Sequence, residues 1–306
     1  MIKSSLRLMA STLAASAVLA QAGFLTTNHP YVIPVGPDYT IVPLLSAGDR
    51  VPHASDPTRE YQTVGIPDGM GAYKDSSSGH VYLFVNHELR NNNTSQALMG
   101  GPLERGAIIS KFTLALDGSV LAGERAYDRV YQGDSLVGSA PTTANLTPAF
   151  NRFCSGSYSG PEHGLDRPMF FAGEESEPPT TFDPVRGGQT VVVFDHELHT
   201  LPKMGHFAKE NTLLQSWPGD RVVVMTLEDG PAGPESQLFM YVGYKDKSPG
   251  ASVLNRNGLN NGALYVFVSN NRKKNSELTF QNGSLAGKWV LIPNAEDMTA
   301  AELEPG

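Results

Sequence analysis

The apolar residues of this chain come in short runs and rarely recur at helical spacing. Most runs are rich in β-branched and aromatic residues and are bounded by Gly, Pro, Asn or Asp, a pattern typical of strands and turns. The runs cover 39–42, 81–85, 108–114, 169–171, 191–194, 222–226, 238–242, 263–268 and 289–292. Helical periodicity is weak and is clearest at 208–215. The pattern predicts an all-β fold with long loops.

The connections between these runs indicate the architecture. The 31 glycines and 22 prolines are spread along the chain and suit many tight turns. Short strands with long loops favour a β-propeller over a compact sandwich, because radial blades tolerate insertions at their rims. The stretch 132–168 is polar, rich in Gly, Ser and Pro, and is predicted to be nearly strandless. Since a loop of this length is usually functional or disordered and holds the lone Cys154, we interpret it as functional.

The N-terminus has the pattern of a secretory signal peptide. Lys3 and Arg7 precede an apolar run at 8–19, and the small-x-small pattern that signal peptidase needs follows at 20–22. The run is too short to span a bilayer. We therefore expect residues 1–22 to be a Sec-type signal peptide, with no membrane insertion and a periplasmic or extracellular location. The remainder, 23–306, is expected to form a single β-propeller domain.

Charge and cysteine content narrow the class of partner. The net charge of −8 argues against nucleic acid as a binding partner, because its phosphates would be repelled. The acidity suits a protein that offers carboxylates to hard cations. With one cysteine, Cys154, no intramolecular disulfide is possible. This thiol can be a buried, inert small hydrophobe or a metal ligand that is protected because it is occupied.

Acidic residues recur where apolar runs end. One carboxylate after a strand is usually part of a solvated turn, but repeated strand ends on one propeller face would converge near the axis. Converging carboxylates repel one another unless cations neutralise them, so the pattern favours a multi-metal site. The candidates are Asp68, Glu88, Glu174, Glu175, Glu210, Glu228 and Asp229.

The order of short motifs resembles the PhoX-type alkaline phosphatases. The motifs are "PDG", "VNHE", "CSG", "GEE", "GxFxxE", a strand ending in acidic residues, "GALYVFV" and "GKWVLI", and they cover about 67–292. The resemblance implies a six-bladed β-propeller with an active-site cluster of iron and calcium that includes a cysteine ligand. It also implies hydrolysis of phosphate monoesters, and hence small phosphorylated substrates.

Carried over position by position, the resemblance implies a set of metal ligands with supporting residues. Cys154 in "NRFCSG" would be the iron-binding thiolate, and at least one of the pair Glu174 and Glu175 would be a ligand. The expected ligands are Glu88, Cys154, Glu174, Glu175, Glu210 and Asp229. The expected supporting residues are Asp68, Asn86, His87 and Glu228.

Two stretches have similar sequences, and the resemblance separates them. "VYLFVNHELR" holds the family's N-H-E motif, whereas "VVVFDHELHT" aligns with a family strand that only ends in a turn. Asp195, His196 and Glu197 are therefore predicted to be surface residues. The "HELH" within "VVVFDHELHT" is not interpreted as a zinc motif, because it follows a β run where neighbouring side chains point to opposite faces.

The chain also departs from the family pattern. The family's T-P-W-G-T stretch is absent, and the G-R-F-x-H-E segment has His206 and Lys209 in place of Arg and His. The D-R-P-E segment that carries the family's active-site arginine and glutamate would lie beyond Gly306. We therefore expect the propeller to be incomplete relative to the six-bladed fold, and we assign no catalytic residue from the sequence.

Three hypotheses follow for function. The first is a secreted metal-dependent phosphatase that hydrolyses phosphate monoesters with iron and calcium. The second is a non-catalytic secreted propeller that binds calcium. The third is a different propeller hydrolase, a calcium-dependent lactonase or phosphodiesterase.

Overall fold

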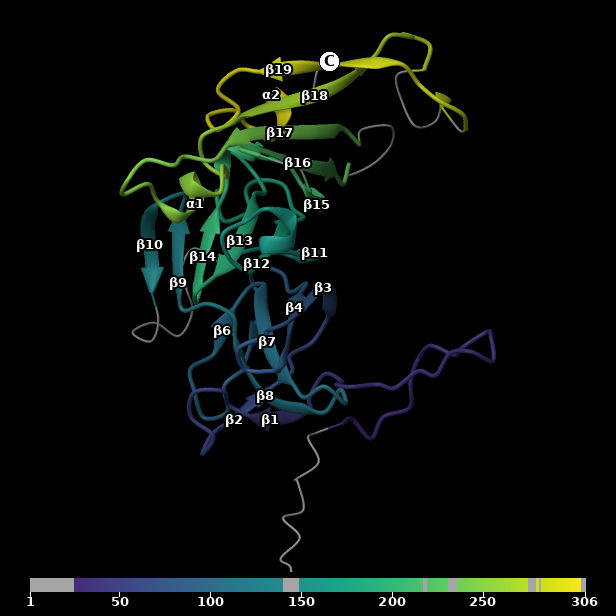
Figure 1. Cartoon of the computed structure of the whole chain (residues 1–306), viewed down its shortest axis with the longest axis vertical. Helices are drawn as coiled ribbons and strands as arrows, with labels where there is room; N and C mark the ends of the chain where they lie inside the picture. Colours follow the sequence, from purple (N-terminus) through teal and green to yellow (C-terminus); the bar gives the residue numbers. More distant parts are fainter. Residues whose placement is uncertain are drawn as a thin grey trace, which may run out of the picture.

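The computed structural model describes residues 25–139, 149–216, 219–230, 236–274, 279–280 and 282–303. Over these residues the chain is mostly β, which confirms the predicted all-β class. Three sheets of four to six strands follow one another along the long axis of the molecule (Figure 1). The predicted signal peptide lies outside the described residues. Within them, none of the helices has the length and apolar character needed to cross a membrane.

The N-terminal sheet is antiparallel with the strand order β3-β4-β7-β8. Its strands are β3 (Pro67–Lys74), β4 (Val81–His87), β7 (Ile108–Leu114) and β8 (Val120–Arg125). Two small pairs flank it: β1 (Arg50–Pro52) with β2 (Glu60–Gln62), and β5 (Thr94–Ser95) with β6 (Glu104–Arg105). The last four residues of β4 are buried, so Asn86 and His87, the polar end of this apolar run, lie in the interior of the protein.

The central sheet has the order β10-β9-β14-β13-β12-β11 and contains one parallel pair, β9 with β14. Its strands are β9 (Arg129–Gln132), β10 (Ser135–Ser139), β11 (Phe153–Ser159), β12 (Met169–Glu174), β13 (Thr190–Phe194) and β14 (Glu197–Thr200). Every residue of β12 and β13 is buried, as expected for strands whose two faces are both covered.

The C-terminal sheet is a meander in sequence order, from β15 to β19. Its strands are β15 (Lys209–Gln215), β16 (Arg221–Glu228), β17 (Leu238–Tyr244), β18 (Ala263–Ser269) and β19 (Gly287–Ile292). Helices are few and short: α1 (Val253–Arg256), α2 (Ala300–Leu303), η1 (Pro161–His163) and η2 (Pro202–Met204). Buried and less buried residues alternate along β16 and β17, which matches the two-residue period of strands.

At three segments the structure differs from what the sequence pattern indicated. Residues 208–215 contain strand β15 and no helix, because pairing with β16 along its length overrides a weak helical periodicity. The stretch 132–168 includes all of β10 and all of β11, while 140–148 lie outside the described residues. Strand β11 was missed because it is rich in Gly and Ser, yet it pairs with β12. Residues 39–42 form no strand, and the side chains of Tyr39 and Val42 are exposed.

Strand β11 passes close to β3, and glycine makes this approach possible. A Cβ atom on Gly69 would lie 2.0 Å from the backbone nitrogen of Gly156 and 2.3 Å from the carbonyl carbon of Ser155. No side chain fits at such a distance. The "PDG" motif therefore serves to bring β3 against β11, and with it Asp68 beside Cys154.

Candidate metal centre

Acidic side chains and the thiol converge where the three sheets meet. Asp68 comes from β3, Cys154 from β11 and Glu210 from β15, and the three strands belong to three different sheets. Sγ of Cys154 lies 3.8 Å from Oδ1 of Asp68 and 3.9 Å from Oε2 of Glu210. One ligand atom from each of Cys154, Glu175 and Glu210 falls within 4.8 Å of the others. Glu88 and Asp229 complete what we call the acidic cluster, since both act electrostatically on Glu210.

Irregular strand pairing explains how these side chains reach a common point. The register of β3 with β4 shifts between Pro67 and Met70, that of β11 with β12 between Phe153 and Gly156, and that of β15 with β16 between Lys209 and Asn211. These three intervals hold the Asp68, Cys154 and Glu210 of the cluster. An irregularity of the bulge kind bends a strand and re-aims its side chains. The ligand geometry is thus set by departures from regular strand pairing.

The electrostatics of the cluster favour a bound cation. Burial raises the pKa of the Cys154 thiol well above its usual range, and the carboxylates of Glu175, Asp68 and Glu210 raise it further. Burial, with the neighbouring Asp229, raises the pKa of Glu175 to about 7. Burial also raises the pKa of Glu210, and the charges of Asp229 and Asp68 raise it further. Burial disfavours the charged forms of these groups and the neighbouring carboxylates add repulsion, so a bound cation would stabilise the charged forms.

The donor set fits the metals that the sequence resemblance implied. A thiolate is a suitable ligand for iron, and carboxylate oxygens are the ligands that calcium prefers. Asp68, Glu175, Glu210 and Asp229 would supply hard oxygen ligands around the sulfur of Cys154. The cluster therefore combines one soft donor with several hard ones, which suits a mixed iron and calcium site.

Polar side chains behind the cluster fix its backbone. Nδ2 of Asn86 donates to the carbonyl oxygens of Cys154, at 2.7 Å, and Ser155, at 3.1 Å. Oγ of Ser155 lies 2.5 Å from the carbonyl oxygen of Glu210 and 2.8 Å from Oδ1 of Asn211. Asn86 therefore holds the backbone of β11 at Cys154 and Ser155. Ser155 was not singled out from the sequence, although the "CSG" motif contained it.

His87 supports the end of β4 rather than facing the cluster. Its ring is fully buried, with Nδ1 3.1 Å from the carbonyl oxygen of Gly65 and Nε2 2.8 Å from Oγ of Ser110. Burial lowers the pKa of His87 to about 4. The ring is therefore neutral at neutral pH and joins β4 to its neighbouring segments.

Within each predicted acidic pair, only one carboxylate joins the cluster. Glu174 is fully buried, and its Oε1 accepts hydrogen bonds from the backbone N–H groups of Asn151 and Phe182, both at 2.8 Å. Oε2 of Glu228 accepts a hydrogen bond from the backbone N–H of Gln237 at 3.2 Å. Successive side chains of a strand point to opposite faces, so the second members, Glu175 and Asp229, face the cluster instead.

Arg152 lies beside the cluster and was not identified from the sequence. Its Nη1 is 3.0 Å from Oε1 of Glu175 and 3.7 Å from Oε1 of Glu88. Its Nε donates to Oγ of Ser176 at 3.3 Å, and its Nη2 donates to the carbonyl oxygen of Glu175. The one available signal was an arginine two positions before the cysteine in "NRFCSG".

The two departures at His206 and Lys209 are accommodated in the interior. Both side chains are fully buried. Nζ of Lys209 donates to the carbonyl oxygen of Met204 at 2.8 Å and lies 2.9 Å from the ring centre of Phe207. Burial lowers the pKa of Lys209 well below its usual value. These residues therefore pack the base of β15 and do not extend the acidic cluster.

The buried His206 predicts a specific loss of stability in acid. Burial lowers the pKa of His206 from 6.5 to about 4, so the unfolded chain binds a proton before the folded chain does. Stability is full above about pH 6.5 and falls as the pH drops toward 4, by about 3 kcal/mol from this group. We expect His206→Gln to lose less stability between pH 7 and pH 4 than the wild type, measured by urea unfolding. The exposed His29 offers the control, and an equal pH slope in His29→Gln and His206→Gln would contradict the prediction.

The stretch "VVVFDHELHT" lies apart from the cluster. Asp195 and His196 are exposed and form the two-residue turn between β13 and β14, with positive φ angles of 47° and 60°. Glu197 is half-buried and pairs with Arg129 and His199, both at 3.0 Å. Its carboxylate therefore pairs with neighbouring side chains within the central sheet.

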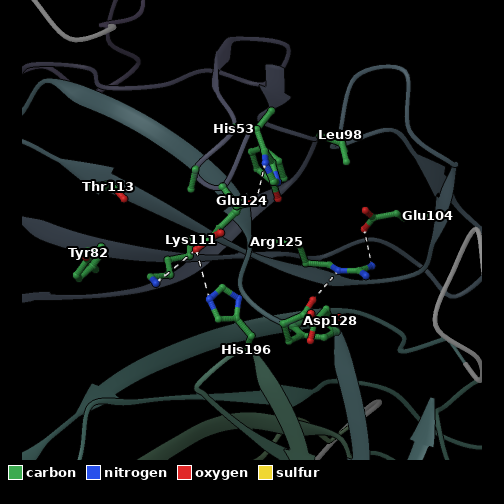
Figure 2. Close-up of a pocket in the computed structure, with 14 residues that line it drawn as sticks. His53, Tyr82, Leu98, Glu104, Lys111, Thr113, Glu124, Arg125, Asp128 and His196 are labelled. Carbon is green, nitrogen blue, oxygen red and sulfur yellow. Dashed lines mark hydrogen bonds and ion pairs between the residues drawn. The ribbon is translucent and has the colours of Figure 1, made fainter. Parts of the chain in front are cut away.

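A cavity lies away from the acidic cluster, between the N-terminal sheet and the β13–β14 turn. Its volume is about 690 Å³, and Figure 2 shows that its charged side chains face one another. Lys111 pairs with Glu124 at 3.5 Å, and Arg125 pairs with Glu104 at 3.0 Å. Because these charges already neutralise each other, we place the candidate site at the acidic cluster, whose carboxylates are mutually repulsive.

Comparisons with known proteins give one similarity. No protein-family model matches the chain, and no curated protein matches it. The chain is similar to PhoX of Pseudomonas fluorescens, whose structure was solved in complex with vanadate, a transition state analogue. The two are 15% identical with a TM-score of 0.48, over 78% of this chain and 51% of PhoX, so the chain spans about half the length of that protein.

Proposed function

We propose that this chain holds iron and calcium in the acidic cluster and hydrolyses phosphate monoesters there. The observation that carries the proposal is the convergence of Cys154, Glu175 and Glu210, with ligand atoms within 4.8 Å of one another. The side chains of the cluster come from three separate sheets, and burial together with neighbouring carboxylates raises the pKa of Glu175 and Glu210. When bound, the metals would neutralise the charge of the phosphoryl oxygens.

The surroundings of the cluster suit a phosphate ester. A cavity of about 540 Å³ opens beside Arg152 and is also lined by Arg90, Asn91, Asn151 and Ser176. These side chains offer guanidinium, amide and hydroxyl donors, which match the acceptor oxygens of a phosphate group. The acidic Glu177 also lines the cavity. Among the described residues, no aromatic side chain lines this cavity. Small polar phosphate esters therefore fit it better than lactones, whose rings lack charge.

We further propose that the three large sheets are blades of a β-propeller in a domain that begins after residue 22. The support is that side chains from strands of all three sheets meet at one point, as strand ends of radial blades do. The N-terminal pattern supports export by a Sec-type signal peptide to the periplasm or the outside of the cell.

Metal analysis together with a phosphatase assay tests the proposal. The chain would be refolded with Fe³⁺ and Ca²⁺, desalted, analysed for both metals and assayed with p-nitrophenyl phosphate. We expect both metals to be retained and the ester to be hydrolysed. Retention of neither metal would overturn the proposal. Calcium alone, with no hydrolysis, would favour the non-catalytic calcium-binding alternative.

The two stretches of similar sequence provide a matched pair of variants. Glu88 lies in the cluster, whereas Glu197 is held by Arg129 and His199. We expect Glu88→Gln to lower the metal content of the refolded protein, and Glu197→Gln to leave it unchanged. Elemental analysis of both variants beside the wild type measures the effect. Equal metal content in all three proteins would remove Glu88 from the ligand set.

A further inference from the structure

The backbone of Arg152 is held in an uncommon conformation. Its φ is +56°, in the left-handed region that residues with side chains adopt rarely and at some cost. Its N–H donates to the carbonyl oxygen of Leu89 and its own carbonyl accepts from the N–H of Glu175, both at 2.9 Å. Contacts from two other segments thus fix the residue and direct its side chain toward Glu88 and Glu175.

The guanidinium of Arg152 is fixed on several sides. It faces the carboxylates of Glu175 and Glu88 at 3.0 and 3.7 Å. From behind, Oγ of Ser176 and the carbonyl oxygen of Glu175 hold two further nitrogens. The side chain of Glu175 is 9% exposed and that of Arg152 is 33% exposed. A pair this shielded and this well hydrogen-bonded differs from a loose surface ion pair.

The charge of the cluster is therefore asymmetric. Glu88 and Glu175 share the permanent positive charge of Arg152. Across the described part of the chain, Asp68, Glu210 and Asp229 form no ion pair with a basic side chain. The protein itself neutralises part of the charge on one side of the cluster, and the remaining negative charge, around Cys154, is left for metal ions.

We infer that Arg152 is a built-in cation that takes the place of one metal ion between Glu88 and Glu175. The inference rests on the proposed metal site and adds the number of metal ions that the site can hold. Two facing carboxylates require a positive charge, and a guanidinium supplies it at every physiological pH. The Glu88–Glu175 side can then hold its shape before any metal binds, and the carboxylate oxygens of these two residues that do not face Arg152 stay available to metal ions bound around Cys154.

Removal of the guanidinium tests this role. We would refold wild type, Arg152→Gln and Arg152→Lys with and without Ca²⁺, count bound calcium by elemental analysis, and follow urea unfolding. The expected result is that Arg152→Gln binds one more calcium ion per chain than the wild type. Its urea midpoint should be lower without calcium and should recover when calcium is added. Arg152→Lys should keep the wild-type calcium count, because it retains the charge.

Controls separate this inference from the proposed function. Arg129→Gln removes a 3.0 Å ion pair with Glu197 outside the cluster, and any loss of stability there should not respond to calcium. If the wild type binds iron through Cys154 but Arg152→Gln binds no additional calcium, the inference fails and the proposed function stands. If Arg152→Gln folds only when calcium is present, the inference is supported. If it folds neither with nor without calcium, the ion pair is purely structural and the inference is overturned. Absence of both metals from the wild type overturns both proposals.

Discussion

Replacement of Cys154 by alanine is expected to abolish iron binding. The thiol is the one soft donor of the cluster, and Asp68, Glu175 and Glu210 surround its sulfur. Loss even of groups that only orient metal ligands typically costs about 10–100-fold in affinity, so loss of the ligand itself should cost at least about 100-fold. The measurement is iron content after refolding with excess iron and desalting. Loss of the thiolate-to-iron absorption band should accompany it, together with loss of phosphate ester hydrolysis.

A control on the same strand shows whether the effect is specific. Ser157 also lies on β11, and its Oγ donates to the carbonyl oxygen of Thr212 on β15 at 2.7 Å. Ser157→Ala removes a contact between the same two strands without removing a ligand, and it should retain iron. Cys154→Ser should keep calcium, because a hydroxyl is a hard donor, but lose the absorption band. Full iron content in Cys154→Ala would leave the half-buried thiol as an inert small hydrophobe, close to the other interpretation that its sequence context allowed.

Much of the strand content could be predicted because its signal is local. The run at 191–194, for example, is β-branched and aromatic and forms the buried strand β13. Strands β11 and β15 lacked that signal. The first is polar and rich in Gly and Ser, and it becomes a strand through its pairing with β12 and its close approach to β3. Such a strand is defined by partners far away in sequence, which periodicity within one segment does not reveal.

The sequence indicated which types of residue form the candidate site better than it indicated the directions in which their side chains point. Motif order located both acidic pairs, but the side-chain direction within a pair depends on strand register, which placed Glu175 and Asp229 in the cluster and turned Glu174 away. Arg152 was missed for a related reason. Its contact with the cluster depends on a left-handed backbone conformation that sequence spacing does not indicate.

Gly69→Ala is expected to disrupt the metal centre without touching a ligand. Its new Cβ would lie 2.0 Å from the backbone nitrogen of Gly156, and a backbone atom cannot rotate out of the way. Strand β3 must then move away from β11, which separates Asp68 from Cys154. Overpacking of this kind typically costs about 3 kcal/mol at the upper end of its usual range. We expect a lower urea midpoint and a lower metal content in the same variant.

A nearby glycine distinguishes this effect from a general intolerance of substitution. A Cβ on Gly65 would meet no atom within 4 Å, and Gly65 has no positive φ. Gly65→Ala should therefore keep both the stability and the metal content of the wild type. If Gly69→Ala matched Gly65→Ala in both measurements, β3 and β11 could not be packed as closely as described. If it lost stability but retained all its metal, Asp68 would not need its place beside Cys154. Loss of both in Gly69→Ala alone would establish that the close approach of two strands holds the ligands together.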